Sequence, residues 1–320
     1  MKLARYLGNG EIAIVDEPVP ACPPGGLLVK TEASGLCSGE LMDWYMDRKV
    51  PHVLGHEVAG IITESGDDRF PVGSRVFVHH HAPCLRCSYC ARSLFVQCEQ
   101  WKRTKLIPGG MAEYFAASKE NLTDTLLVDD LRAIDAALIE PLGCVAKSLL
   151  VAGVPRGRKL SHAVVGLGSM GLMHALVTGA VAYDINPARV AYARSLGIDA
   201  RSPEERKQAD TIYICPGTNS ALDFALSIAN PGATVVLFAP MAPGDKSVLD
   251  LHDLYFSEIS LIPSYSCGPV ATRTAAGFLR DGRVKAEQVV SDFIGIDELP
   301  DAYRKMKKGE ILKAMVLFES

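Results

Sequence analysis

A glycine-rich turn near the middle of the chain constrains the fold more than any other feature. The run Val164–Gly171 reads V-V-G-L-G-S-M-G, an apolar stretch that leads directly into the pattern G-x-G-x-x-G. In such a turn the first glycine permits a tight bend, the second lets a pyrophosphate approach the backbone, and the third lets helix and strand pack closely. The pattern alone is weak because glycines are common in turns, so its surroundings must decide.

The surroundings of this turn predict a wound α/β domain. From about Ile139 to Ser264, apolar strand-like runs alternate with helical patterns such as Pro187–Leu196 and Ser220–Ala229. The expected strands are Ala163–Gly166, Ala180–Asp184, Thr211–Cys215, Thr234–Ala239 and Ser260–Pro263. Alternation of this kind is typical of a doubly wound parallel sheet with helices on both faces, and with the glycine-rich turn it predicts a Rossmann dinucleotide-binding domain.

An acidic residue at the end of the second expected strand bears on the choice of dinucleotide. Asp184 can accept hydrogen bonds from an adenosine ribose and repel a 2′-phosphate, which favours NAD over NADP. It could instead cap the helix that Pro187 begins. Arg189 could offset the preference or bind an adenosine phosphate, or it could lie on a solvated helix face. The expected dinucleotide-binding residues are Gly166, Gly168, Ser169, Met170, Gly171, Asp184, Arg189, Cys215, Pro216 and Phe238.

The parts of the chain before and after this predicted domain have a different residue pattern. The first 140 or so residues are rich in short β-branched runs, such as Leu27–Thr31 and Arg75–His79, separated by Gly and Pro. The tail, Gly268–Ser320, contains a helical stretch around Asp297–Lys308 and an apolar strand, Ala314–Phe318. This order suggests that the last segment folds back onto the first domain.

Four closely spaced cysteines predict a structural zinc site. Cys84, Cys87, Cys90 and Cys98 follow the spacing C-x2-C-x2-C-x7-C, which lets a short loop surround a tetrahedral ion with four thiolates. A disulfide pair or a C-x-x-C redox motif are the alternatives, and neither needs four cysteines. Because four thiolates leave no open position, this ion should hold its lobe together and take no part in chemistry.

Three more residues could bind a second metal ion. Cys37, His56 and Glu140 offer a thiolate, an imidazole and a carboxylate, and three protein ligands leave a fourth position open to water or substrate. Each also has an ordinary interpretation: a buried small apolar residue, a satisfied core histidine and a charge at a helix N-terminus. Spacing alone does not group them.

The ordered motifs resemble one family along essentially the whole chain. G-L-C-S-G-E, P-x-V-L-G-H-E-x-A-G, the cysteine lobe, G-G-M-A-E-Y, E-P-L and G-L-G-S-M-G occur in the order seen in medium-chain zinc-dependent alcohol dehydrogenases. The glutamate of E-P-L resembles the polyol (sorbitol) and threonine dehydrogenase branches. The resemblance implies a GroES-like, β-rich catalytic domain over residues 1–143, a Rossmann domain over 144–266, and a return segment over 267–320 that completes the catalytic domain.

The resemblance also implies roles for single residues. The catalytic zinc would bind Cys37, His56 and Glu140 in an interdomain cleft, with Glu57 as an exchangeable ligand and Glu40 as a supporting partner, so each chain would hold two zinc ions. The family usually places a hydroxyl two residues after the cysteine, where this chain has Gly39, so Ser38 is the remaining candidate for the proton relay. His81 stands where threonine dehydrogenases place a histidine near the substrate, although it could also be an exposed strand end. The stretch between Gly171 and Asp184 is about two helical turns shorter than usual, which predicts a short helix.

These features lead to one expected function and two alternatives. We expect a hydride transfer between a secondary alcohol, of polyol or sugar-like type, and NAD, with NADP less favoured. A threonine-type amino-alcohol dehydrogenase and a non-catalytic zinc- and dinucleotide-binding redox sensor remain open, whereas the metal ligands disfavour a zinc-free reductase. The partners should be a small alcohol or ketone and further copies of the chain in a homodimer or homotetramer, as the family suggests.

Charge and hydropathy set the remaining expectations. The net charge of -4 offers no basic surplus for nucleic acid. No apolar run reaches the length of about 18 residues that a membrane span needs. The first residues lack the apolar core of a secretory signal, so the sequence predicts a cytoplasmic protein whose cysteines are thiols or metal ligands.

Overall fold

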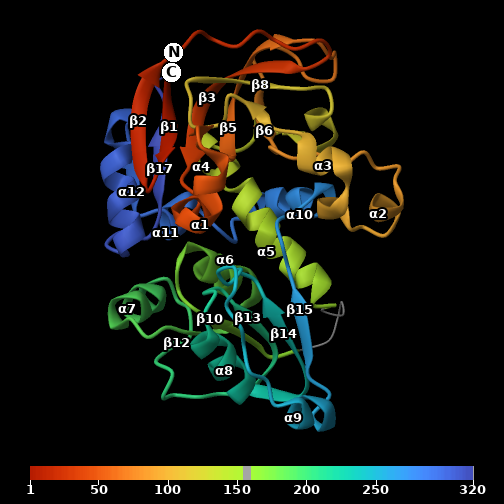
Figure 1. Ribbon diagram of the computed structural model, residues 1–320, viewed down its shortest axis with the longest axis vertical. Helices are drawn as coiled ribbons and strands as arrows, with labels where there is room; N and C mark the ends of the chain where they lie inside the picture. The colour runs from red at the N-terminus through yellow and green to blue at the C-terminus, as the bar shows by residue number, and fades with distance from the viewer. Residues whose placement is uncertain (154–159, 320) are drawn as a thin grey trace. The chain divides into compact units, whose positions relative to one another are not determined.

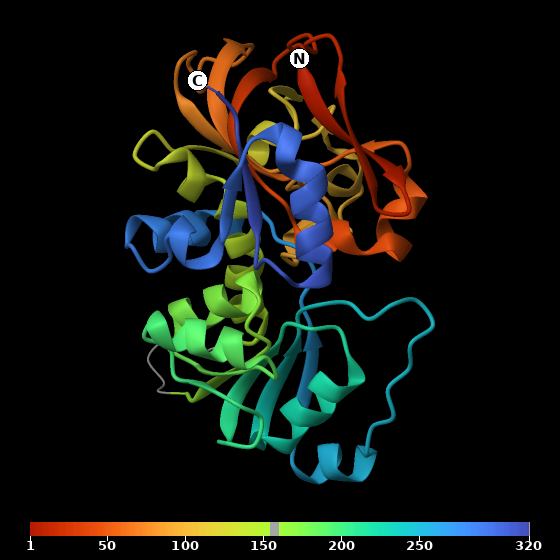
Figure 2. The same cartoon turned by 90° about the vertical axis from the view of Figure 1, so that its left-hand side faces the viewer.

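The protein divides into two compact units, which are described separately (Figure 1). The computed structural model describes residues 1–153 and 160–319. Unit 1 contains residues 1–143 together with 267–320, and unit 2 contains residues 144–266. Both chain ends lie in unit 1 (Figures 1 and 2). Among the described residues, no helix combines the length and the apolar character that crossing a membrane requires.

Unit 1 is built on two sheets. The larger has the order β16-β17-β3-β5-β6-β9, and β8 pairs with both β3 and β7. Its strands are β3 (Leu27–Gly35), β5 (Glu57–Ser65), β6 (Arg75–Val78), β7 (Leu106–Ile107), β8 (Tyr114–Ala117), β9 (Thr125–Leu127), β16 (Asp292–Ile294) and β17 (Ala314–Leu317). The smaller sheet, of order β2-β1-β4, consists of β1 (Lys2–Gly8), β2 (Glu11–Asp16) and β4 (His52–Val53). Strand β3 is buried along nearly all its length, and it pairs with β5 on one edge and with β17 and β8 on the other.

The C-terminal segment completes the larger sheet. Strand β17 runs antiparallel to β3, with Met315 opposite Gly35. Helix α12 (Leu299–Lys308) buries Leu299, Tyr303 and Met306 in a core that also contains Leu36 and Leu54. This spacing places the apolar side chains on one face of the helix. The return segment is therefore an integral part of unit 1, since β17 pairs with β3 in the larger sheet.

Short helices fill the connections of unit 1. Besides α12, the α-helices that lie wholly in unit 1 among the described residues are α1 (Asp43–Met46), α2 (Ser88–Ala91), α3 (Glu99–Arg103), α4 (Ala133–Ala136), α10 (Pro269–Arg280) and α11 (Ala286–Val289). The 3-10 helices are η1 (Ser38–Leu41), η2 (Asp47–Lys49), η3 (Phe95–Gln97), η4 (Asn121–Asp124) and η5 (Ile296–Glu298). Helix α5 (Ile139–Val151) begins in unit 1 and ends in unit 2.

Unit 2 contains a parallel six-stranded sheet of order β12-β11-β10-β13-β14-β15. Its strands are β10 (His162–Val165), β11 (Val181–Tyr183), β12 (Ala200–Arg201), β13 (Ala209–Ile214), β14 (Ala229–Leu237) and β15 (Ser260–Pro263). The helices are α6 (Ser169–Thr178), α7 (Pro187–Ser195), α8 (Asn219–Ser227) and α9 (Leu251–Phe256). The strand order reverses between β10 and β13, which is the switch point where dinucleotides bind in doubly wound sheets. The expected parallel sheet is confirmed.

Two local features of unit 2 depart from what the sequence pattern predicts. Strand β14 begins at Ala229, before the turn-like stretch Asn230–Gly232, and its ladder with β13 is irregular there. Helix α9 has no counterpart in the expected elements, because its short apolar run follows a polar, proline-containing stretch. The short helix expected after the glycine-rich turn is α6, which ends at Thr178, before Gly179 in a left-handed conformation.

Candidate functional site

The four lobe cysteines converge on one point in unit 1. The sulfur atoms of Cys84, Cys87, Cys90 and Cys98 all lie within 4.8 Å of one another. Their only buried apolar companions in the lobe cluster are Val96 and Trp101, a core too small to order the segment by itself. Hydrogen bonding from the backbone N–H of Arg86 lowers the pKa of Cys84 to about 6, which favours the thiolate. This geometry fits one tetrahedral ion with no open position.

A second set of ligand atoms, which we call the outer cluster, consists of Cys37, His56 and Glu57. Their ligand atoms lie within 4.8 Å of one another. Cys37 caps the N-terminus of η1, and His56 and Glu57 stand at the start of β5. A thiolate, an imidazole and a carboxylate form a set of donors that suits zinc and leaves one coordination position for a further ligand.

Glu40 ties the two loops of the outer cluster together. Its buried carboxylate accepts hydrogen bonds from the backbone N–H groups of Cys37 (3.3 Å) and Gly55 (2.8 Å). The same carboxylate lies 3.3 Å from Nδ1 of His56. Burial raises the pKa of Glu40, but the stronger combined effect of His56 and the Gly55 N–H lowers it to about 2. An ionised Glu40 holds the imidazole through Nδ1 and leaves Nε2 for a metal ion.

Glu57 is held by a buried lysine that the sequence analysis did not single out. Nζ of Lys313 lies 2.5 Å from Oε2 of Glu57, and both side chains are 1% exposed. The ammonium group also donates to the backbone oxygen of Leu36 at 3.0 Å. Opposite Glu57 in the sheet stands Gly35, where a Cβ would come within 2.2 Å of Oε2, so only glycine leaves room for the carboxylate. Burial lowers the pKa of Lys313, but the negative charge of Glu57 and Cys37 raises it above its usual value.

Glu140 lies in a different group of ligands. Its carboxylate, Nε2 or Nδ1 of His79 and Sγ of Cys267 lie within 4.8 Å of one another, and we call this set the inner cluster. The structure thus brings Cys37 together with His56, as expected, and groups Glu140 with two residues that sequence reasoning did not consider. Helix α5 begins at Ile139, which places Glu140 in its first turn, and the backbone oxygen of Glu140 lies 3.8 Å from Sγ of Cys267.

Ser38 and His81 are the residues that the sequence suggested for the proton relay and for contact with the substrate. Ser38 is exposed, and the N–H of Gly39 donates to Sγ of Cys37 at 3.3 Å. The ring of His81 packs on Trp101, and its Nδ1 lies 2.8 Å from the backbone oxygen of Thr104. His80 was not predicted: its ring centroid lies 4.8 Å from that of His56. No hydrogen bond from any described residue reaches its buried Nδ1.

The glycine-rich turn of unit 2 has the expected geometry. A Cβ at Gly171 would lie 1.8 Å from the backbone oxygen of Gly166, so this close approach of helix α6 to strand β10 requires glycine. Gly168 caps helix α6, and the space beside its Cα is open. Ser169 and Met170 form the first turn of the helix, where free N–H groups favour an anion.

The carboxylate of Asp184 contacts the glycine-rich turn. It accepts hydrogen bonds from the N–H groups of Leu167 (2.7 Å) and Asn186 (2.8 Å). The residue that caps helix α7 is Asn186, whose side chain accepts from Ala188, so Asp184 is not the helix cap that Pro187 had suggested as an alternative. A guanidinium nitrogen of Arg189 lies 3.9 Å from the Asp184 carboxylate.

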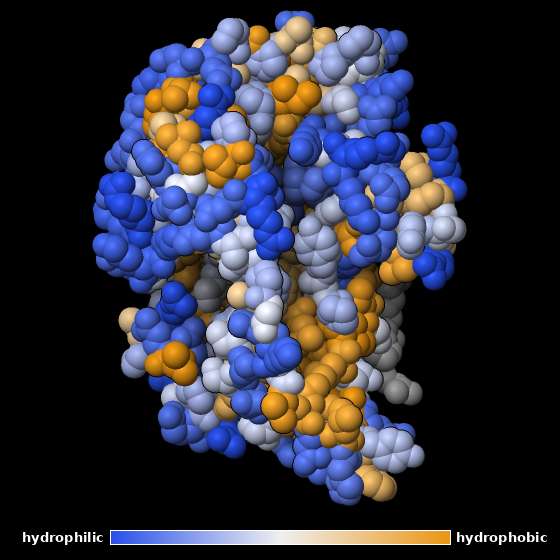
Figure 3. All heavy atoms as spheres, viewed as in Figure 1, coloured by the Kyte–Doolittle hydropathy of each residue, from blue (hydrophilic) through white to orange (hydrophobic). Residues whose placement is uncertain are grey.

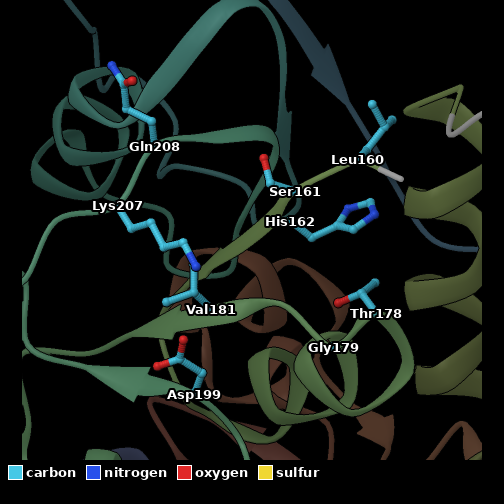
Figure 4. Close-up of a pocket in the computed structure, with 9 residues that line it drawn as sticks. All are labelled: Leu160, Ser161, His162, Thr178, Gly179, Val181, Asp199, Lys207 and Gln208. Carbon is cyan, nitrogen blue, oxygen red and sulfur yellow. The ribbon is translucent and has the colours of Figure 1, made fainter. Parts of the chain in front are cut away.

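The other expected cofactor residues lie at the carboxyl ends of neighbouring strands. Cys215 follows β13 and its N–H donates to Val165, while Phe238 follows β14 and its N–H donates to Ile214. Pro216 continues the turn after β13. A separate cavity of about 160 Å³ lies at the opposite ends of the strands, lined by His162, Lys207 and their neighbours (Figure 4). Because dinucleotides bind at carboxyl ends, that cavity is not part of the expected site.

Comparisons with known proteins agree with this arrangement. Residues 23–126 match the alcohol dehydrogenase GroES-like domain. The chain is 27% identical to D-altritol 5-dehydrogenase of Agrobacterium fabrum, over 95% of this chain and 96% of that protein. It is 28% identical to sorbitol dehydrogenase of Bacillus subtilis, over 99% and 97% of the two chains.

Solved structures share the whole fold. A zinc-binding dehydrogenase from Sinorhizobium meliloti bound to NADP superposes with a TM-score of 0.87 at 23% identity, covering 99% of each chain. The alcohol dehydrogenase of Thermus sp. ATN1 gives a TM-score of 0.86 at 22% identity, covering 100% of each. The expected fold class, a GroES-like unit and a Rossmann unit, is confirmed. With its motifs in order, its two folded units and relatives that match along nearly their full length, this chain is similar throughout to medium-chain zinc-dependent alcohol dehydrogenases, and residues 23–126 match their GroES-like domain.

Proposed function

We propose that this protein is a zinc-dependent dehydrogenase that transfers a hydride between a secondary alcohol, of polyol or sugar-like type, and NAD. The observation that carries the proposal is the outer cluster, whose thiolate, imidazole and carboxylate lie within 4.8 Å of one another in a chain that also has a dinucleotide-binding turn. The altritol and sorbitol dehydrogenases among its relatives support polyols as the substrate class.

The residues around the outer cluster would each contribute a defined part. Cys37 and His56 would hold the ion, with Glu57 or Glu140 as the carboxylate ligand. A bound zinc ion supplies a Lewis acid that lowers the pKa of a coordinated hydroxyl group. Glu40 keeps the imidazole in the tautomer that offers Nε2, and Lys313 balances the negative charge of Glu57 and Cys37.

His80 is a better candidate than Ser38 for contact with the substrate. Its ring lies beside His56, and burial lowers its pKa well below the usual value, so the ring is neutral and can both donate and accept a hydrogen bond. Its Nδ1 has no hydrogen-bond partner among the described residues. A substrate hydroxyl next to the outer cluster would supply that partner. By contrast, His81, on which the threonine-type alternative depends, is already bonded to Thr104 and packed on Trp101.

The proposal is tested by reduction of NAD in the presence of a panel of polyols, with threonine as a comparator. His56→Ala should reduce turnover by about 10³-fold or more, because a metal contributes several kcal/mol to the transition state. The variant should still bind NAD, since the dinucleotide turn lies in unit 2. A chelator should abolish turnover before it unfolds the protein, and added zinc should restore it. Normal turnover by His56→Ala would rule the mechanism out, and reduction with threonine alone would rule out the substrate class.

We also propose that Asp184 makes NAD the preferred cofactor. Its carboxylate sits against the N–H of Leu167 in the glycine-rich turn, where a ribose hydroxyl would lie within reach. Asp184→Ser, which keeps an acceptor, should lower the ratio of kcat/KM for NAD over NADP by about tenfold, because a charge-assisted hydrogen bond and a repulsive charge are both lost. Arg189→Ala should change the ratio in the opposite direction. A wild-type enzyme that prefers NADP would contradict the assignment.

We infer further that the protein assembles from identical copies through unit 2. Strand β15 is an edge strand, paired only with β14 among the described residues. Beside it, exposed hydrophobic side chains are concentrated around α9: Val248 (95% exposed), Leu251, Tyr255 and Phe256. Figure 3 shows hydrophobic residues gathered around β15 and α9. An open sheet edge next to apolar side chains is suited to pairing with the same edge of a second copy.

A further inference from the structure

One buried histidine of unit 2 has no part in the proposed mechanism. His174 lies in the middle of helix α6 and is 0% exposed. An imidazole in the interior needs hydrogen-bond partners for its ring nitrogens, because burying them without partners costs free energy. Burial lowers the pKa of His174 to about 4, so the ring is neutral at pH 7. The ring therefore acts on its neighbours through hydrogen bonds and packing and not through charge.

Two hydrogen bonds fix the orientation of this ring. Nδ1 of His174 lies 2.8 Å from the backbone oxygen of Met170, one turn earlier in α6. A carbonyl oxygen can only accept, so Nδ1 carries the proton and Nε2 is left as an acceptor. The hydroxyl of Ser148, in helix α5, lies 2.8 Å from Nε2 and donates to it. One buried side chain thus ties α6 to α5.

The ring packs against two of the residues expected at the dinucleotide site. Its centroid lies 4.7 Å from that of Phe238, with the two ring planes at 88°. Its Nδ1 lies 3.8 Å from Sγ of Cys215. Cys215 follows β13 and Phe238 follows β14, at the carboxyl ends where doubly wound sheets bind dinucleotides. Because an edge-to-face contact favours one arrangement of two rings, His174 restricts the orientation of Phe238.

Helix α6 depends on such an anchor because it is short. It contains ten residues, Ser169–Thr178, and a helix shorter than about 12–15 residues is marginally stable without tertiary contacts. Its first turn carries the N–H groups that would face the pyrophosphate. A shift of the helix would turn these groups away from the phosphates. The hydrogen bond between His174 and Ser148 opposes sliding and rotation of α6 against α5.

We propose that His174 is a positioning residue for the dinucleotide: it aligns helix α6 with the pyrophosphate and holds Phe238 and Cys215 at the ends of their strands. It does not touch the dinucleotide itself, because protein atoms cover it completely. The inference rests on the proposed function, since it assigns a role to this residue at the proposed cofactor site. It requires weaker binding of the dinucleotide in variants of His174, with the preference for NAD over NADP unchanged, because that preference is assigned to Asp184.

The test is the dissociation constant for NAD of the purified full-length chain, measured by titration calorimetry. His174→Leu removes the ring and both hydrogen bonds, while the hydroxyl of Ser148 can still donate to the backbone oxygen of Val145 at 2.7 Å. We expect the Kd of this variant to rise about tenfold, which corresponds to the loss of an aromatic contact and a buried hydrogen bond. The kcat at saturating NAD should not change, which is the pattern of an interaction lost equally in the ground state and the transition state.

Two further variants separate the hydrogen bond from the ring. Ser148→Ala removes the hydrogen bond to Nε2 and keeps the ring of His174, so its Kd should rise by a smaller factor than that of His174→Leu. His174→Gln replaces the ring with an amide that can still bond to Ser148, so it should recover part of the affinity that His174→Leu loses.

His162→Leu is the matched control. The rings of His162 and His174 both pack on Tyr213, with centroids 6.2 Å and 4.8 Å from that of the tyrosine, so both substitutions alter the same core. His162, however, begins β10 and lines the cavity at the opposite ends of the strands (Figure 4). His162→Leu should lower the midpoint of thermal unfolding and leave the Kd for NAD unchanged, at a temperature where circular dichroism shows every variant to be folded.

Several results would overturn the proposal. His174→Leu could bind NAD as tightly as the wild type, or His162→Leu could lose as much affinity, which would reduce the effect to a weakened core. A changed ratio of NAD to NADP affinity in His174→Leu would place its effect at the adenosine ribose. If His174→Leu does not fold, Ser148→Ala decides, and an unchanged Kd contradicts the role. A wild type that binds neither NAD nor NADP would refute the proposed cofactor site and this inference with it, whereas equal binding by the wild type and all variants refutes the inference alone.

Discussion

Lys313 occupies an unusual place for a lysine. It stands directly before β17, and its side chain is 1% exposed, with its ammonium group held by Glu57 and the backbone oxygen of Leu36. Burying an ammonium group costs several kcal/mol, and the ion pair with its additional hydrogen bond offsets that cost. The position of Glu57 next to Cys37 therefore depends on a residue from the far end of the chain.

Replacement of this lysine should strongly destabilise the protein. Lys313→Met leaves the buried Glu57 carboxylate without its counter-charge, which is expected to cost about 3–5 kcal/mol in the free energy of unfolding. Denaturant unfolding measures the change, after a chelator has removed the ion of the outer cluster, which would otherwise supply Glu57 with a positive charge. Lys2→Met is the control: Lys2 pairs with Asp297 at 2.6 Å, but on the surface, and its removal should have little effect. Equal small changes in both variants would show that the Lys313 pair contributes no more than a surface pair.

At the scale of secondary-structure elements, the contact of helix α6 with strand β10 leaves the least room for a side chain. Gly171 lies where a Cβ would come within 1.8 Å of the backbone oxygen of Gly166. The first turn of this helix also carries the N–H groups that would face the pyrophosphate. A side chain here affects both the packing of unit 2 and the path of the dinucleotide.

Gly171→Ala should lower the free energy of unfolding by about 1–3 kcal/mol and weaken the binding of NAD, because the helix must move away from the strand. Gly277→Ala provides a matched comparison inside helix α10, since a Cβ there meets no atom within 4 Å. That substitution should stabilise the protein by about 0.5–1 kcal/mol, because alanine has a higher helix propensity than the glycine it replaces. Thermal unfolding measures the stability of the two variants, and titration with NAD measures their affinity for the dinucleotide. A Gly171→Ala variant with wild-type NAD affinity would contradict the assigned role of the turn.

At the scale of the whole molecule, the proposed assembly of identical copies through unit 2 can be tested. Tyr255 and Phe256 are 76% and 72% exposed, which is more than a lone chain would be expected to tolerate beside an open sheet edge. The double variant Tyr255→Asp, Phe256→Asp should be monomeric, because two charges would have to be desolvated at the interface. Light scattering after size-exclusion chromatography gives the mass. Val72→Asp, at an exposed hydrophobic position in unit 1, should leave the mass unchanged. A monomeric wild type would refute the interface.

The local sequence pattern was sufficient to predict those features that depend only on residues close together in the chain. The parallel sheet of unit 2, the glycine-rich turn and the return of the Ala314–Phe318 strand follow from apolar periodicity and from glycines at fixed offsets, which act over a few residues. The convergence of the four lobe cysteines follows from their close spacing, because a loop that short can surround only one point. The membership of Cys37 and His56 in one cluster came from resemblance to a family, not from spacing.

Only the tertiary structure decided which distant side chains meet. Glu140 lies with His79 and Cys267, and Glu57 lies against Lys313, because packing of α5, α10 and the C-terminal strand brings together residues that no local pattern connects. His80 likewise became a candidate only when its ring was found beside His56 with an unpartnered Nδ1. The sequence by itself determined the elements and the chemistry available. The fold decided the partners, because the distance between two side chains depends on how all the intervening elements pack and not on their separation along the chain.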